Sequence, residues 1–303
     1  MGALRWGVIG LGRAGLAKVK AIEALGPRGG SLVAVASRRA LPHELSERHP
    51  GLAHVTWEEL VSSPEIDAVA ICTENRLHGL QARAALSSGK HTLVDFPLCL
   101  SSAEFDELTQ LAAQRNCLLH QELIGLIAPS HLLLAAQLRA EDPVSQLSIH
   151  FQGGLKAWVR AEAQASRWGL LALGRLQRAW ALAGPLRLLE AELNSGLDGA
   201  YTLSLLMEGE AGSEVRLVES RGLELSRQMS LELVTRSGAQ LHHLLPQPLP
   251  RPERPLFELD LSLFSERVEA LERGEAVEHY VPELAQRGVM ELIDELGARL
   301  GLA

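Results

Sequence analysis

The residues with the clearest chemical meaning are three glycines near the start of the chain. Gly10, Gly12 and Gly15 fit the spacing G-x-G-x-x-G, directly after a strand-like run and at the opening of a helical stretch. The first glycine allows a tight turn, the second lets the backbone approach a pyrophosphate, and the third lets helix and strand pack closely. Free N–H groups at the helix start favour phosphate. We therefore predict a dinucleotide site made by Gly10, Gly12, Arg13, Ala14 and Gly15, the alternative being an ordinary glycine-rich turn.

The residues after the next strand bear on which dinucleotide binds. Sites that prefer NAD usually carry an acidic side chain there, which accepts hydrogen bonds from the ribose 2′-OH. This chain has Ser37, Arg38 and Arg39 instead. Guanidinium groups bind a 2′-phosphate through charge-assisted hydrogen bonds. The sequence therefore predicts NADPH as the cofactor, with NADH as the second choice; the alternative is that both arginines are solvated surface residues.

Polar side chains follow the later strands of the same half. Thr73 and Glu74 come after one apolar run, His78 opens the next helical stretch, and Asp95 ends another run. Ligands of doubly wound sheets bind at the carboxyl ends of the strands. We expect Thr73, Glu74 and Asp95 to lie near the nicotinamide ribose, although Asp95 is also placed to cap a turn. His78 either caps its helix or lines the nicotinamide pocket.

Apolar periodicity predicts the elements that position these residues. Within the first 120 residues, continuous apolar runs alternate with amphipathic stretches, which is typical of a parallel sheet covered on both faces. Ser101 and Glu104 have the capping-box spacing of a helix start. We predict an α/β fold whose residues 1–122 form a doubly wound Rossmann domain, with strands near 4–9, 32–36, 67–72, 91–95 and 117–120 and helices near 13–25, 77–87 and 101 onward.

The hydrophobic periodicity changes after about residue 140. Runs such as Leu147, Ile149 and Phe151 alternate with polar residues, as they do near 186–193, 201–207, 215–219 and 229–233. Period-two alternation indicates an antiparallel sheet with one covered face. Helices are expected over 167–183, 256–273 and 282–300, and five prolines make 246–255 an extended connector. We therefore predict a second, α+β domain over 123–303 with a large open antiparallel sheet.

Composition narrows the class of protein. The net charge of −8 gives no general attraction to nucleic acid or to anionic membranes. No apolar run is long enough for a membrane span, and the first residues lack a signal-peptide pattern, so we expect a cytoplasmic protein. The cysteines have no metal-binding spacing and are expected to be buried thiols. His242 and His243 are adjacent, so on a strand they would face opposite sides. We predict no metal site.

Residues 89–97 add a resemblance to these patterns. Together with residues 73–78 they resemble the Gfo/Idh/MocA oxidoreductase family, which implies a Rossmann domain followed by an open antiparallel sheet. In that family a lysine that assists the oxidation of sugar alcohols stands where this chain has Phe96. Because phenylalanine neither accepts nor donates a proton, sugar dehydrogenation by that route is disfavoured.

Within this family the chain resembles the biliverdin reductases. The similar segments are residues 12–15, 37–39, 71–74, 89–97 and 119–120, and in the second half 174–176 with Trp180 and Gly184, and 219–222. The resemblance implies reduction of the linear tetrapyrrole biliverdin to bilirubin by hydride transfer from NADPH to the central methine carbon, as in heme catabolism.

The same resemblance assigns roles near the substrate. Arg175 matches an arginine proposed to act near the pyrrole nitrogens, and Arg178 lies on the same helix face as a second partner for a propionate. A guanidinium is a poor general acid, so it is better suited to polarising the tetrapyrrole or holding a water. Phe96 offers a flat wall for a conjugated ligand. Surface ion pairing is the alternative for both arginines.

Two departures from the biliverdin reductases leave other functions open. Phe96 replaces a tyrosine, and Leu123 replaces the histidine of a Glu-His pair. One alternative is therefore a reductase of this family with another small substrate. Another is a non-catalytic NADP-binding sensor or scaffold that uses its open sheet to bind a partner. The oligomeric state is either a monomer or a homodimer formed through that sheet.

Overall fold

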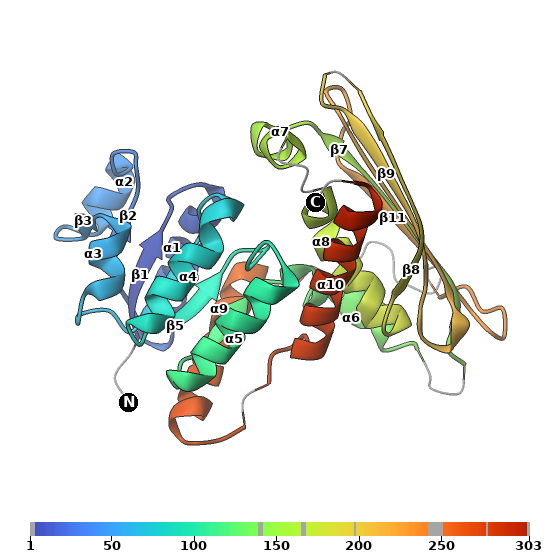
Figure 1. Cartoon of the computed structure of the whole chain (residues 1–303). Helices are drawn as coiled ribbons and strands as arrows, with labels where there is room; N and C mark the ends of the chain where they lie inside the picture. Colours follow the sequence, from blue (N-terminus) through green and yellow to red (C-terminus); the bar gives the residue numbers. More distant parts are fainter. Residues whose placement is uncertain are drawn as a thin grey trace. The chain divides into compact units, whose positions relative to one another are not determined.

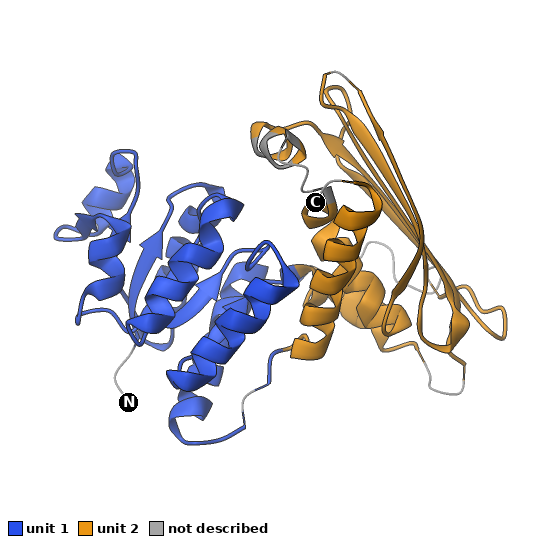
Figure 2. Ribbon diagram, viewed as in Figure 1, with its two compact units in different colours: residues 1–124, 252–279 blue, residues 125–251, 280–303 orange. Residues whose placement is uncertain are grey.

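A computed structural model describes residues 4–138, 142–164, 168–196, 198–241, 251–276 and 278–301 of the chain. The chain divides into two compact units (Figure 2). Unit 1 comprises Met1–Ile124 and Pro252–His279, and unit 2 comprises Gly125–Arg251 and Tyr280–Ala303. The first boundary lies close to the predicted one. The second part of the prediction needs a correction, because residues 252–279 return to unit 1.

Unit 1 is built on a six-stranded parallel sheet with the order β3-β2-β1-β4-β5-β6 (Figure 1). The order reverses between β1 and β4, so the carboxyl ends of these two strands flank a topological switch point, where ligands of such sheets bind. The predicted doubly wound sheet is confirmed. Its strands are β1 (Arg5–Ile9), β2 (Ser31–Ala36), β3 (Ala53–Val55), β4 (Ala68–Ile71), β5 (His91–Val94) and β6 (Leu119–Gln121).

Helices cover both faces of this sheet. α1 packs against α9, whereas α3, α4 and α5 pack together along the chain. The Ser101 hydroxyl accepts a hydrogen bond from the Glu104 N–H at 3.2 Å, which confirms the predicted helix start. The helices of unit 1 are α1 (Arg13–Leu25), α2 (His43–Arg48), α3 (Trp57–Ser62), α4 (Asn75–Ser87), α5 (Ser102–Gln114) and α9 (Leu256–Glu272), with a 3-10 turn, η1 (Gly26–Arg28); another, η2 (Ile124–Leu126), lies at the unit boundary.

Helix α9 explains why residues 252–279 belong to unit 1. Leu261, Phe264 and Val268 are fully buried in one core cluster with residues of α1, β1, β4 and β5. The ring of Phe264 lies 5.1 Å from that of Trp6. Burying aromatic and aliphatic side chains of this size stabilises a domain by about 1.5–3 kcal/mol each. The amphipathic pattern of α9 predicts a helix but not which core it completes.

Unit 2 contains a five-stranded sheet with the order β11-β7-β10-β9-β8. β7 and β10 pair in parallel and the other neighbours are antiparallel, so the sheet is mixed rather than wholly antiparallel. Buried and less buried residues alternate along β7, β9 and β10, which confirms the one covered face. The strands are β7 (Val144–Gly154), β8 (Arg187–Ser195), β9 (Tyr201–Glu208), β10 (Glu214–Gly222) and β11 (Gln228–Thr235).

The covered face of this sheet packs against helices. α8 contacts β7 and β10, and α10 contacts both α8 and β8. Residue 167, His242, His243 and much of the proline connector lie outside the described residues. None of the described helices is long and apolar enough to cross a membrane. The helices of unit 2 are α6 (Pro129–Ala135), α7 (Ala157–Gln164), α8 (Trp168–Ala183) and α10 (Glu283–Arg299), with a 3-10 turn, η3 (Glu210–Gly212).

Candidate cofactor and substrate sites

The glycine loop follows β1 and opens α1, as predicted. Gly10 has φ +90°, and a Cβ there would lie 2.4 Å from the Cys72 carbonyl oxygen. A Cβ on Gly15 would lie 1.8 Å from the carbonyl oxygen of Gly10, so both positions are closed by packing. A Cβ on Gly12 would meet none of the described atoms within 4 Å. Gly12 therefore presents open backbone at the start of α1, as a pyrophosphate requires.

The basic residues after β2 lie beside this loop. The side chain of Arg38 is 84% exposed, and its Nη2 is 2.6 Å from Glu74 Oε1. Hydrogen bonds from Arg38 and then Arg76 lower the pKa of Glu74. Because β2 and β4 lie on either side of β1, the Arg38–Glu74 pair spans the end of the glycine loop. Arg39 is exposed, and its backbone N–H donates to Ser37 Oγ at 3.1 Å.

The loops after β4 and β5 are held together by His78. Its Nδ1 is 2.7 Å from the carbonyl oxygen of Pro97, and its Nε2 is 3.2 Å from that of Thr73. The imidazole is 1% exposed, so it ties the two loops together from within. Thr73 donates its hydroxyl proton to Gln81 Oε1 at 2.6 Å. Of the two expected roles for His78, this geometry supports the structural one, and contact with the nicotinamide stays a prediction.

Phe96 is an exposed aromatic residue at this edge of the sheet. Its side chain is 40% exposed, unlike most large apolar residues of unit 1, and it precedes Pro97 through a cis peptide bond. Asp95 next to it is partly exposed, whereas Leu123 is buried. An exposed aromatic ring at the ligand-binding edge of a doubly wound sheet is suited to stacking on a flat ligand.

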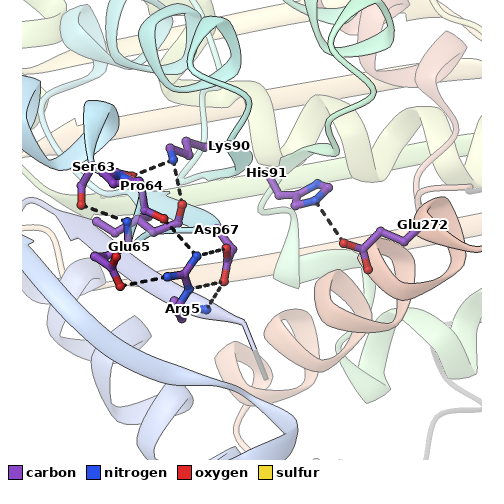
Figure 3. Close-up of polar contacts among 9 residues, drawn as sticks. Arg5, Ser63, Pro64, Glu65, Asp67, Lys90, His91 and Glu272 are labelled. Atoms are coloured by element: carbon purple, nitrogen blue, oxygen red, sulfur yellow. Dashed lines mark hydrogen bonds and ion pairs between the residues drawn. The ribbon is translucent and has the colours of Figure 1, made fainter. Parts of the chain in front are cut away.

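The opposite edge of the sheet carries a different set of charges (Figure 3). Arg5 at the start of β1 binds Asp67 at 2.8 Å and Glu65 at 3.0 Å. Lys90, which comes just before β5, donates to the carbonyl oxygens of Ser63 and Ile66, and its burial lowers its pKa. Amino ends of the strands lie away from the ligand-binding edge. These contacts therefore stabilise loops and exclude Lys90 from the cofactor site.

Unit 1 also buries a charged cluster that the sequence analysis missed. Lys18 of α1 is fully buried, with Nζ 2.5 Å from Glu122 Oε2 and 2.8 Å from Asp260 Oδ2. Asp260 Oδ1 also lies 2.9 Å from His120 Nε2. Burial alone lowers the pKa of Lys18, but the two carboxylates outweigh it and raise the pKa overall. A lysine on the buried face of α1 was the available signal, since lysine is almost never fully buried without a partner.

In unit 2 the predicted substrate residue Arg175 belongs to a polar cluster on the covered face of the sheet. Glu219 is fully buried and accepts hydrogen bonds from Arg175 Nε at 2.9 Å, Arg221 Nε at 2.8 Å and the Tyr201 hydroxyl at 3.0 Å. Both guanidinium groups lie over the ring of Phe151, at 4.4 and 4.5 Å. Among the described residues, the guanidinium groups of Arg175 and Arg221 both bind the carboxylate of Glu219.

Arg178 lies one turn further along α8. Burial lowers its pKa, and its buried Nε has no hydrogen-bond partner among the described residues. Burial, and then the charge of Arg178, lower the pKa of His131 to about 4. A buried guanidinium nitrogen without a partner is costly, by about 1–3 kcal/mol. Arg178 is therefore not a solvated surface arginine, and its buried Nε makes it a candidate to bind an anionic ligand.

Comparisons with known proteins agree with this geometry. Residues 4–123 match the model of an oxidoreductase family with an NAD-binding Rossmann fold, the Gfo/Idh/MocA family. This part of the chain is similar to that family, and together with the relatives below the match identifies the chain as an NAD(P)-dependent oxidoreductase.

Individual proteins that are similar to this chain point to more specific relatives. Biliverdin reductase A of Homo sapiens is 28% identical over 77% of this chain and 76% of that protein. The 1,5-anhydro-D-fructose reductase of Ensifer adhaerens is 33% identical, but over 38% of this chain and 34% of its own. The fold matches a crystal structure of Synechocystis biliverdin reductase in complex with biliverdin and NADP+, with a TM-score of 0.80, 22% identity and coverage of 97% and 98% of the two chains. The resemblance stated from the sequence is confirmed.

Proposed function

We propose that the chain reduces a linear tetrapyrrole of the biliverdin type to the corresponding bilirubin, with NADPH as the hydride donor. The observation that carries this proposal is the similarity to biliverdin reductase A over 77% of the chain. Phe96 supports it, because the residue at the family's lysine position has no proton to exchange with a sugar alcohol. The guanidinium of Arg175, held by Glu219, supplies hydrogen-bond donors and positive charge that suit the propionate groups of a bilin.

The geometry of unit 1 supports the proposed cofactor residues. The backbone at Gly12, Arg13 and Ala14 is placed to bind the pyrophosphate at the start of α1. Ser37 and Arg39 are placed to bind a 2′-phosphate, and Arg38 joins them when it leaves Glu74. An exposed ion pair of this kind is worth about 0–1 kcal/mol, so a phosphate displaces it easily. The bound nicotinamide supplies the hydride.

The chain's own residues position the substrate and control protons. Phe96 provides a flat surface beside the expected nicotinamide position, at the carboxyl end of β5. Arg175 is held by Glu219, so it acts as a fixed positive charge that polarises the tetrapyrrole or orients a water towards it. It is not itself an acid, because a guanidinium keeps its proton at all accessible pH values. Arg178 is the second proposed contact for a propionate.

An absorbance assay tests this proposal. Protein, NADPH and biliverdin are mixed, and the loss of the biliverdin band is followed together with the loss of NADPH absorbance. We expect both to fall in equal amounts while a yellow product forms. Arg175→Ala should lower kcat by at least tenfold, equivalent to about 1.4 kcal/mol of transition-state stabilisation. Arg216→Ala is the matched control, because Arg216 is exposed on β10 and pairs with Glu214.

A binding protein without catalysis is the second candidate. It is favoured by the apolar residues Phe96 and Leu123, which remove two polar groups expected near the pocket in biliverdin reductases. Tight binding of NADPH together with no change in the biliverdin band would refute the reductase and support this candidate. Turnover of another small carbonyl or imine substrate, with biliverdin inert, would instead favour a different reductase of the family.

A further inference from the structure

Three side chains line up beyond the carboxyl ends of β4, β5 and β6. Ile71 pairs with Val94 and Val94 with Gln121, so the next residues, Cys72, Asp95 and Glu122, lie side by side. The N–H of Asp95 donates to the Ile71 carbonyl and that of Glu122 to the Val94 carbonyl, both at 2.9 Å, which continues the sheet pairing. Neighbouring side chains at equivalent positions of paired strands point to the same face. Two carboxyl groups are therefore neighbours.

This face is the one covered by α1 and α9. Leu93 and Leu118 lie in the same core cluster as Phe264 of α9, and Asp95 and Glu122 continue their alternation. Lys18 reaches Glu122 from α1, as described above. Lys18 of α1, Asp260 of α9, His78 of α4 and Cys72 after β4 interact electrostatically with one or both carboxyls. His120 of β6 binds Asp260, and Arg267 and His279 contact His120 in turn.

Hydrogen-bond directions decide how the charges of this cluster are distributed. Arg267 Nη1 lies 2.8 Å from His120 Nδ1, and a guanidinium only donates. His120 therefore accepts at Nδ1 and donates its Nε2 proton to Asp260, so the imidazole is neutral, consistent with a pKa lowered by burial. Asp260 receives both this bond and the Lys18 ammonium. These contacts keep Asp260 ionised and lower its pKa against the effect of burial.

The one ammonium of Lys18 is shared between Glu122 at 2.5 Å and Asp260 at 2.8 Å, and Asp95 is a further carboxyl beside Glu122. Burial raises the pKa of Asp95. Burial, together with Asp95 and Asp260 and against Lys18, raises the pKa of Glu122 to about 8. Two adjacent carboxyls in a poorly solvated place do not both ionise at neutral pH, and their titration belongs to the pair.

We propose that Asp95 and Glu122 together hold one proton at neutral pH, and that the pair releases it when the oxidised cofactor, rather than the reduced one, binds. The proposal deepens the proposed function, because it relies on the cofactor site at the glycine loop. With the 2′-phosphate at the end of β2, a dinucleotide that crosses the switch point places its nicotinamide half beyond β4 and β5, where Asp95 is partly exposed.

The physical cause is the charge of the nicotinamide ring. The ring carries a positive charge in NADP+ and none in NADPH. A cation close to a carboxyl favours the ionised form, so NADP+ lowers the proton affinity of the pair. By linkage, loss of the proton strengthens NADP+ binding by the same factor. During reduction, NADPH loses two electrons with the hydride, and the substrate needs one further proton at a nitrogen. The proton released by the pair balances this step, and solvent restores it when the cofactor is exchanged.

Calorimetry without any tetrapyrrole tests the proposal. NADP+ and NADPH are each titrated into the whole chain at pH 7 in Hepes and in imidazole, whose ionisation enthalpies differ, and the difference in heat gives the protons exchanged. Both cofactors carry the 2′-phosphate, so its titration cancels. We expect NADP+ to release ~0.5–1 proton more than NADPH, and the Kd ratio of the two cofactors to change by up to about tenfold per pH unit.

Two variants assign the proton to the pair. Asp95→Asn and Glu122→Gln should each abolish the difference between NADP+ and NADPH while both cofactors still bind. Glu107→Gln, which changes an exposed carboxyl on α5, should keep it. Equal proton release for the two cofactors in the wild-type chain overturns the proposal, whatever the variants do. Asp95 is the less buried of the two carboxyls. A difference in proton release between NADP+ and NADPH that persists in Asp95→Asn also overturns the proposal. Failure to reduce biliverdin leaves this test intact, because it uses cofactor alone.

Discussion

Replacement of the loop glycines separates ligand binding from packing in unit 1. A methyl group at Gly12 would enter open space, whereas one at Gly15 would lie 1.8 Å from the carbonyl oxygen of Gly10. Gly12 also has φ −74°, which alanine adopts without strain. Gly12→Ala should therefore cost the fold only about 0.5–1 kcal/mol, the usual loss for alanine at a helix N-cap. Gly15→Ala should cost about 1–3 kcal/mol or more, because backbone has to move.

For cofactor affinity, Gly12→Ala is the informative variant. If the pyrophosphate lies against the backbone of Gly12, a methyl group there holds it away from the N–H groups at the start of α1. Gly12→Ala should then weaken NADPH binding at least tenfold, or about 1.4 kcal/mol, in a chain that is still folded.

Fluorescence titration with NADPH and thermal unfolding measure the two effects on the same samples. Gly297→Ala in α10 is the matched control, because a Cβ there also meets nothing within 4 Å and the site is remote in sequence from the loop. It should leave the cofactor affinity unchanged and raise the free energy of unfolding by about 0.5–1 kcal/mol, because alanine favours a helix interior over glycine. The reasoning is refuted if Gly12→Ala binds NADPH as tightly as the wild-type chain, or if it unfolds as readily as Gly15→Ala.

Three further predictions follow from the contacts of unit 1. Arg38→Ala should reduce the preference for NADPH over NADH several-fold, and Glu74→Gln should raise NADPH affinity by up to about fivefold because it frees Arg38 from a pair worth ~0–1 kcal/mol; unchanged Kd values in both would contradict the assignment. Lys18→Met should lower the free energy of unfolding by about 3–5 kcal/mol, measured by denaturant titration, because it leaves two buried carboxyls without their cation; a loss below ~1 kcal/mol would show that the cluster relaxes. Folding raises the pKa of Glu122 to about 8. The stabilisation that protonated Glu122 gives to the folded chain is therefore present at acid pH, and it is lost as the pH rises through that value. In Glu122→Gln the free energy of unfolding should fall less as the pH rises. An unchanged pH profile in this variant would contradict the raised pKa of Glu122.

Local patterns in the sequence predicted much of the fold. The glycine spacing, the apolar runs and the Ser101 cap all report on residues that are close in the chain, and each was confirmed. The period-two runs of the second half also predicted the covered face of the sheet. They did not predict that β7 and β10 pair in parallel, because side-chain alternation is the same for both pairings.

Long-range contacts could not be predicted in this way. α9 was predicted as a helix, but its return to unit 1 depends on how Phe264 fits against Trp6, which no local pattern shows. Lys18 finds Asp260 across most of the chain, so the charged cluster is invisible in either segment alone. The pair between Glu74 and Arg38 was not predicted, because it depends on the sheet order, which places the ends of β2 and β4 on either side of the loop. Contact of Glu74 with the nicotinamide ribose stays a prediction.

Isotope transfer is the most direct test of the central claim, that hydride passes from the cofactor to a tetrapyrrole. NADPH carrying deuterium at C4, on one face or on the other, is mixed with the chain and biliverdin, and the product is analysed by mass spectrometry and NMR. One deuterium is expected at the central bridging carbon of the product from one of the two labelled forms. Product without deuterium from either form, or no product while NADPH is bound, would contradict it.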